Sequence, residues 1–209
     1  MLKNSMWISI ILGIVCGALC ALLDLIPNDN IWTFSSFSGS LGFWAITGMI
    51  IVMQYEKRWK SAVGTFIYFA VMNTSFFIVH YLISPMFRFP RISKLSVALN
   101  ESVLWLIPSV ICGVCALVVF NAKKDDILGT IVLALPMGLL LYEAICLVLS
   151  IIINHKYLFQ TIIDIIGILV LWYLYSKRKN KIALGVLTII VAGSLLIAAY
   201  ILYSTILFI

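Results

Sequence analysis

Charged side chains are scarce in this sequence, and no long hydrophilic stretch separates its apolar runs. Only 11% of the 209 residues are charged and 64% are hydrophobic, whereas a soluble domain has roughly 25% charged and 45–50% apolar residues. A folded chain this poor in polar groups could not cover its surface with them, so lipid must cover part of it. The composition predicts an integral membrane protein, in a lipid bilayer, with a single transmembrane domain over residues 1–209.

Motifs of common catalytic sites are absent as well. The chain has two histidines, His80 and His155, and neither belongs to a His-Glu-x-x-His zinc motif. It has no Gly-x-Ser-x-Gly nucleophile motif and no phosphate-binding Walker loop. We therefore expect no enzyme, no catalytic residue, and no cofactor or resident metal.

Cysteines are few and odd in number, and all five lie in apolar stretches. Such a set is not typical of a disulfide framework. Cys112 and Cys115 have the spacing of a zinc-binding pair, but no second pair and no histidine follows them. Cysteine also serves as a small apolar residue in packed helices, and we interpret these five in that way.

Long apolar runs, by contrast, are abundant. A helix that spans a bilayer needs about 20 apolar residues, and seven runs approach or exceed this length. The predicted fold is an all-α bundle of about seven transmembrane helices. The second run is short and contains Ser40 and Thr47, so six helices are the alternative. The predicted helices cover residues 6–23, 39–53, 61–83, 97–120, 127–153, 158–175 and 182–208.

Positive charges are unevenly distributed between the two sets of connections. The net charge of +6 comes from short clusters between apolar runs, which suit anionic lipid headgroups rather than nucleic acid. Because Lys and Arg favour the cytoplasmic side, seven helices predict a cytoplasmic N-terminus and an external C-terminus. Ten cations then face the cytoplasm: Lys3, Lys57, Arg58, Lys60, Lys123, Lys124, Lys177, Arg178, Lys179 and Lys181; four face outward: Arg88, Arg91, Lys94 and Lys156.

Two acidic residues lie deep in the apolar runs. An Asp at the centre of a membrane helix costs roughly 2.5–3.5 kcal/mol on insertion scales, so Glu143 and Asp164 call for an explanation. With a turn near residues 154–157, Glu143 lies about 16 Å and Asp164 about 10 Å below the external surface, at about 1.5 Å per residue. The helices that carry them are consecutive, so the two carboxyl groups could share a pocket.

Four further polar residues belong to the predicted site. His80 and Glu101 lie near the external ends of their helices, whereas Asn73 and Tyr142 lie deeper. Together with the two deep carboxyl groups they predict an acidic cavity in the outer half of the bundle, for a small solute, a cation, a proton or an amine-bearing ligand. The alternative is structural: protonated carboxyl groups that only tie helices together.

Small residues recur at the spacing of close helix contacts, as at Gly13, Gly17 and Ala21. Such faces let helix backbones approach each other. They would serve internal packing, a homo-oligomer or another membrane protein. The second candidate function is therefore a non-catalytic membrane partner, such as an assembly, immunity or sensor-associated subunit.

Part of the chain resembles a known family. The Ser-rich entry that ends in Gly42-Phe43-Trp44, the cationic loop 57–60 and the pairs Met72-Asn73 and His80-Tyr81 are similar to an uncharacterised bacterial multi-pass family, domain of unknown function 6518. The resemblance covers roughly the first 85 residues. It implies a bacterial cytoplasmic membrane and supplies no functional residues.

Overall fold

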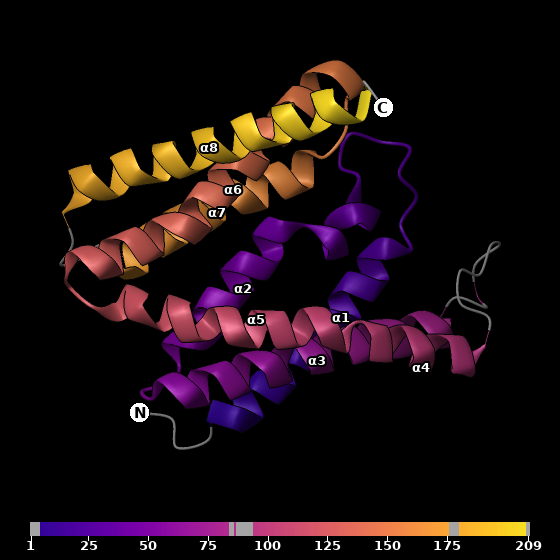
Figure 1. Ribbon diagram of the computed structural model, residues 1–209. Coiled ribbons are helices and arrows are strands. Elements are labelled where there is room, and N and C mark those ends of the chain that lie inside the picture. Colours follow the sequence, from indigo (N-terminus) through magenta and orange to yellow (C-terminus); the bar gives the residue numbers. More distant parts are fainter. Residues whose placement is uncertain (1–4, 84–85, 87–93, 176–179, 208–209) are drawn as a thin grey trace. The chain divides into compact units, whose positions relative to one another are not determined.

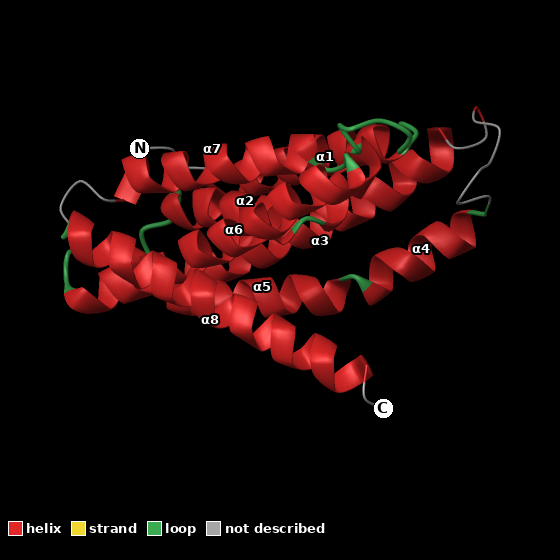
Figure 2. Cartoon of the chain, turned by 90° about the horizontal axis from the view of Figure 1, so that it is seen from above, coloured by secondary structure: helices red, strands yellow, loops and turns green. Residues whose placement is uncertain are grey.

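The structure, a computed structural model, describes residues 5–83, 86, 94–175 and 180–207. Every regular element in these ranges is a helix, as Figures 1 and 2 show. Six of the helices described there are long and apolar enough to cross a membrane. The predicted all-α membrane bundle is confirmed, and the chain is a multi-pass membrane protein.

The second predicted helix is the one that falls short. Helix α2 (Leu41–Met53) has 13 residues, about 20 Å of length against about 30 Å of hydrocarbon. A 3-10 helix, η1 (Phe34–Gly39), precedes it. The spanning helices are α1 (Ser5–Asp24), α3 (Arg58–Ile83), α4 (Leu95–Leu104) continued by α5 (Leu106–Val119) and η3 (Phe120–Lys123), α6 (Ile127–Asn154), α7 (Leu158–Tyr175) and α8 (Lys181–Leu207).

The predicted helix 97–120 is interrupted at Trp105, between α4 and α5. Pro108 explains the position of the break, because proline has no N–H to donate to the carbonyl four residues earlier and its ring crowds that turn. The carbonyl of Trp105 accepts hydrogen bonds from the Ser109 hydroxyl (2.8 Å) and from the Asn73 side-chain amide (3.5 Å). Two polar side chains thus donate hydrogen bonds to a backbone carbonyl at the position where the helix is interrupted.

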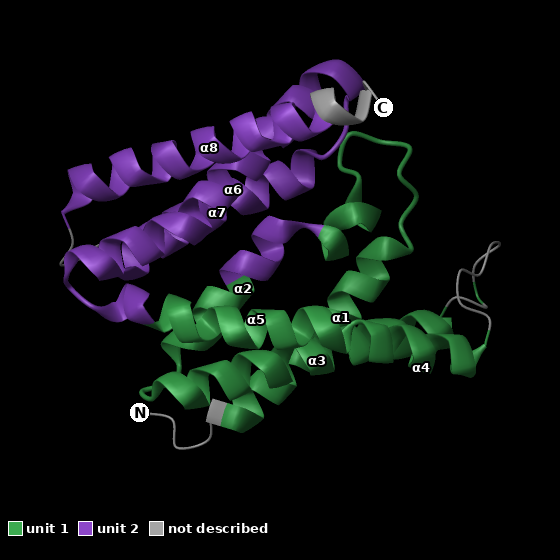
Figure 3. Cartoon of the chain, in the orientation of Figure 1, with its two compact units in different colours: residues 1–39, 47–120 green, residues 40–46, 121–209 purple. Residues whose placement is uncertain are grey.

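The helices form two compact units, coloured separately in Figure 3. The first comprises residues 1–39 and 47–120, and the second comprises residues 40–46 and 121–209. Helix α2 is divided between them. Whether they form a single domain, as the sequence predicted, stays a prediction.

In the first unit, α1 and α3 lie side by side and run in the same direction. A Cβ at Gly17 would overlap with the carbonyl oxygen of Met72, so the two backbones are in contact there. About two turns further along, Asp24 at the end of α1 meets His80 near the end of α3. The order of these contacts makes the helices parallel.

Two parallel helices require the chain between them to return to its starting side. The Ser9 and Tyr55 hydroxyls confirm this return, because they form a buried hydrogen bond of 2.8 Å that joins the first turns of α1 to the residues just before α3. The connection that contains α2 therefore runs the length of the α1–α3 pair. The connection that contains α2 thus returns the chain to the starting side of α1, as the predicted second helix would.

Helix α5 runs antiparallel to α3. Asn73 donates to the Ser109 hydroxyl (3.2 Å) near one end of the pair, and Arg58 Nε donates to the Leu117 carbonyl (2.6 Å) at the other. The second bond places a cation on a carbonyl in the last turn of α5, where the helix dipole favours positive charge.

In the second unit, α6, α7 and α8 follow one another up and down, as the views in Figures 1 and 3 show. His155 ends α6 in the left-handed conformation (φ 53°) and starts the short turn into α7. Helix α8 packs on α6, where Gly138 lies against the Thr188 carbonyl and Val191. Ser40 and the first residues of α2, up to Ile46, complete this unit.

Candidate functional site

The first turn of α2 is bound by a carboxyl group of α6. Glu143 Oε1 accepts hydrogen bonds from the Ser40 hydroxyl (3.1 Å) and from the Leu41 amide (3.2 Å). Its Oε2 accepts a short hydrogen bond from the Gly42 amide. The Ser40 hydroxyl in turn accepts from the Phe43 amide (3.4 Å). The N–H groups at the start of α2, which no helical carbonyl can reach, thereby find acceptors.

The depth of this turn explains why it needs such partners. Glu143 lies about 16 Å from the end of the 28-residue α6, at about 1.5 Å per residue, so α2 begins well inside the span. No bulk water is available there to satisfy free N–H groups. Helix N-termini also carry partial positive charge, which the Glu143 carboxylate offsets.

A second carboxyl group lies against the same turn. Asp164 of α7 is 0% exposed, and its Oδ1 lies directly against Gly42. Asp164 also interacts electrostatically with Glu143. Within the described part of the chain, neither carboxylate oxygen of Asp164 has a hydrogen-bond partner. The site thus holds one carboxyl group that is fully engaged and one that is buried without a donor.

Two glycines allow α2 to approach α7 this closely. A Cβ at Gly42 would overlap with Asp164 Oδ1, and a Cβ at Gly167 would overlap with the Ile46 side chain. Leu140 of α6 contacts both positions. The order of these contacts shows that the start of α2 runs parallel to α7.

Further polar residues lie on α7 toward its N-terminal end. Gln160 and Thr161, one turn before Asp164, are both buried. The Thr161 hydroxyl donates to the carbonyl of Tyr157 (2.9 Å). The buried face of α7 is therefore polar from its first turn down to Asp164 and apolar beyond it, at Gly167 and Leu171.

Of the six residues that the sequence predicted, the structure brings two together, Glu143 and Asp164. Tyr142 is half-buried and precedes Glu143 in the sequence, but its hydroxyl pairs with Cys146 one turn along α6. The other three, Asn73, His80 and Glu101, belong to the first unit. Asn73 donates hydrogen bonds to the Trp105 carbonyl and to the Ser109 hydroxyl at the break between α4 and α5. Glu101 is half-buried on α4.

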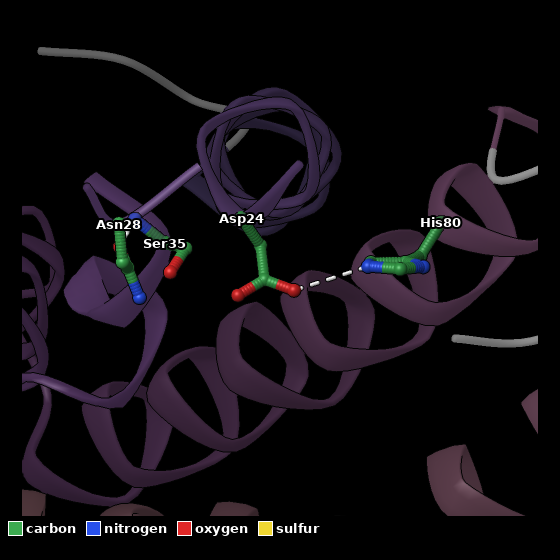
Figure 4. A network of polar contacts seen from close by, with 4 residues as sticks. All are labelled: Asp24, Asn28, Ser35 and His80. Atoms are coloured by element: carbon green, nitrogen blue, oxygen red, sulfur yellow. Dashed lines mark hydrogen bonds and ion pairs between the residues drawn. The ribbon is translucent and has the colours of Figure 1, made fainter. Parts of the chain in front are cut away.

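His80 has a partner of its own in the first unit. Its Nε2 lies 3.0 Å from Oδ2 of Asp24, and both side chains are buried. Figure 4 shows Asp24 pointing from the end of α1 toward His80, with Asn28 and Ser35 beside it. The Asn28 side chain accepts from the Ser35 amide (3.3 Å) and so ties the connection after α1 to η1. The Asp24–His80 contact joins the end of α1 to the end of α3.

The prediction from sequence missed Ser40 and Gly42 as parts of the site. From the sequence, both residues belong to the Ser-rich entry of the second apolar run, which Ser40 weakens. The available signal was the Ser-Leu-Gly step at 40–42, because serine is a common N-cap and glycine permits close approach.

Among the described residues, no cluster of three or more His, Cys, Asp or Glu side chains could hold a metal ion.

These features define a multi-pass membrane protein with a short helix, α2, whose first turn lies within the membrane span and contacts two carboxyl groups. Comparison with protein-family models, curated proteins and solved structures finds no match. The resemblance of the first 85 residues to the domain of unknown function 6518 family therefore stays a prediction.

Proposed function

We propose that this protein binds a small cation or a small amine-bearing solute within the membrane and carries it across. The observation that supports this function is Asp164, a fully buried carboxyl group whose two oxygens have no hydrogen-bond partner among the described residues. Transfer of an isolated carboxylate into an apolar medium is very unfavourable. Such a group is stable only with a proton or with a cationic partner.

The surroundings of Asp164 favour binding over a purely structural role. A carboxyl group that tied helices together would have a donor on a neighbouring helix, as Glu143 has at the start of α2. In membrane transporters, helices that begin within the bilayer frequently mark the binding sites of solutes and coupling ions. Intramembrane carboxyl groups likewise mark ion and proton pathways.

The proposed location is the bacterial cytoplasmic membrane, with the N-terminus in the cytoplasm. The excess of Lys and Arg in the connections on that side supports this orientation. It places the end of α6 and the start of α7 outside, so the polar face of α7 leads from the external surface to Asp164.

Uptake into proteoliposomes tests the proposal. The purified protein is reconstituted with an entrapped dye for each probe ion, and uptake of Na⁺, Li⁺, K⁺ and methylammonium is compared with that of empty liposomes. We expect uptake of at least one probe, and Asp164→Asn should reduce its rate at least about tenfold, as the loss of a charge interaction of about 1.4 kcal/mol would. The matched control is Asp126→Asn, because Asn also caps the helix start where Asp126 binds the Gly129 amide. Equal rates for wild type and Asp164→Asn would refute the proposal.

A membrane partner remains the second candidate, and one observation favours a particular face for it. Gly13 and Gly17 of α1 are covered by α3 within the first unit, whereas Gly185 and Gly193 of α8 have no atom within 4 Å of a built Cβ. A partner helix would therefore pack on α8. Leucine substitution at Gly185 and Gly193 should release such a partner in a pull-down from membranes, and Asp164→Asn should not.

A further inference from the structure

The two carboxyl groups at the start of α2 have different hydrogen-bonding environments, and this difference limits what the site can bind. Both oxygens of Glu143 accept hydrogen bonds from the first turn of α2. This is the pattern of an ionised carboxylate, which acts only as an acceptor. Its charge is offset by the positive end of the helix that it caps.

Asp164 has no such compensation. Its oxygens are buried, they have no donor within the described residues, and Oδ1 lies directly against Gly42. Residues 40–46 contain no titratable side chain. The charged group that acts on Asp164 from α6 is Glu143, and it carries the same sign. Of the two carboxyl groups, only Asp164 therefore still needs a proton or a cation to compensate its charge.

We propose that Asp164 exchanges one proton for one alkali metal cation, while Glu143 acts as a positioning residue that holds α2 in place. The inference rests on the proposed function and assigns the charge that it handles. In the exchange, the O–H bond of the Asp164 carboxylic acid breaks, the carboxylate keeps the electron pair and binds the cation, and the proton leaves to water. One positive charge replaces another, so the bundle never contains an uncompensated Asp164 carboxylate.

A divalent ion does not fit this site. It would require a second anionic ligand, and the carboxylate nearest to Asp164 is already bound to three donors of α2. Release of Glu143 to serve as that ligand would leave the N–H groups of Leu41 and Gly42 without acceptors inside the membrane. The geometry thus selects for a single charge.

Calorimetric titration of the intact protein in detergent tests this exchange. NaCl, LiCl, KCl and MgCl₂ are titrated separately, each in buffers of different ionisation enthalpy, from weakly acidic to weakly alkaline solution. The dependence of the heat on the buffer counts the protons released. We expect one proton per protein for at least one alkali cation, none for MgCl₂, and none for any salt with Asp164→Asn.

The variant Glu143→Gln separates the two roles. Provided that its circular dichroism and unfolding show a folded protein, it should still release one proton, because Gln keeps an acceptor for α2 and the Asp164 carboxyl group that exchanges the proton is still present. Loss of proton release in folded Glu143→Gln, release of two protons, or binding of Mg²⁺ would each overturn the exchange. Cation binding without proton release would also overturn it and would leave the proposed transport function standing, since the two are measured independently.

Discussion

Gly42 and Asp164 are in direct contact, although they lie on different helices and far apart in the sequence. A Cβ at residue 42 would overlap with Oδ1 of Asp164 and crowd the Leu140 side chain at 2.9 Å. The first turn of α2 therefore lies against a buried carboxyl group whose oxygens have no hydrogen-bond partner within the described residues. Any side chain at position 42 must displace either α2 or Asp164.

Gly42→Ala should destabilise the protein and remove its response to cations. Overpacking of a close contact costs typically about 1–3 kcal/mol, and the added methyl group would displace Asp164 Oδ1, the proposed cation ligand. The measurement is unfolding in mixed detergent micelles, followed by circular dichroism with and without the cation identified by uptake.

Gly185→Ala is the matched control, because no atom lies within 4 Å of a Cβ built there. Alanine is up to about 1 kcal/mol better than glycine in a helix interior, so this variant should be unchanged or slightly more stable. A cation response in Gly42→Ala equal to that of the wild type would contradict the assigned contact.

Glu143→Ala should loosen the start of α2. The N–H groups of Leu41 and Gly42 would lose their acceptors, and for Gly42, which is buried, an unsatisfied donor costs about 1–3 kcal/mol. Hydrogen–deuterium exchange in a peptide that covers residues 40–46 should become about tenfold faster or more. A peptide from the first turns of α6 and the exposed variant Glu56→Ala serve as controls. Unchanged exchange at 40–46 would show that Glu143 does not cap α2.

Much of the fold could be predicted from the sequence, because the length of an apolar run sets the length of a membrane helix. The predicted range 158–175 coincides with α7 (Leu158–Tyr175), and 127–153 differs from α6 (Ile127–Asn154) by one residue. The break at Trp105 was harder to place. Pro108 indicates a distortion, but no local pattern indicates the hydrogen bond that the Asn73 side chain of another helix donates to the Trp105 carbonyl.

The site was predictable only in part. The pairing of Glu143 with Asp164 follows from consecutive helices joined by a short turn. The capping of α2 does not, because Ser40 and Glu143 are 103 residues apart and meet through packing that no local pattern encodes. His80 was predicted as a site residue by its position near the external end of its helix, and its buried contact with Asp24 likewise depends on the parallel packing of α1 and α3. Depth identifies polar residues that need partners, but it does not identify the partners.

Removal of the Asp24–His80 contact should destabilise the first unit. Asp24→Ala would leave Nε2 of a buried His80 without the carboxylate that lies 3.0 Å away, at a cost of about 1–3 kcal/mol. In a double-mutant cycle with His80→Phe, the two effects should be less than additive by at least about 0.5 kcal/mol. Asp29→Ala, an exposed acid in the connection that follows α1, is the control. Strict additivity in unfolding measurements would show that the contact contributes nothing.

The parallel arrangement of α1 and α3 predicts on which side of the membrane each connection lies. Residues 29 and 57 flank the return of the chain through α2, and both are exposed. With the five native cysteines replaced by alanine, Asp29→Cys and Lys57→Cys should be labelled from opposite sides by a membrane-impermeant maleimide.

The orientation of α5 extends this prediction to a third position. Because α5 is antiparallel to α3, Lys124→Cys should be labelled from the same side as Lys57→Cys. With the excess of cations in the cytoplasm, intact right-side-out vesicles should label Asp29→Cys alone, and inverted vesicles should label the other two. Labelling of positions 29 and 57 from one side would mean that α2 enters and leaves the membrane on the same face. The external half of the bundle would then have to be reassigned, and with it the side from which a cation reaches Asp164.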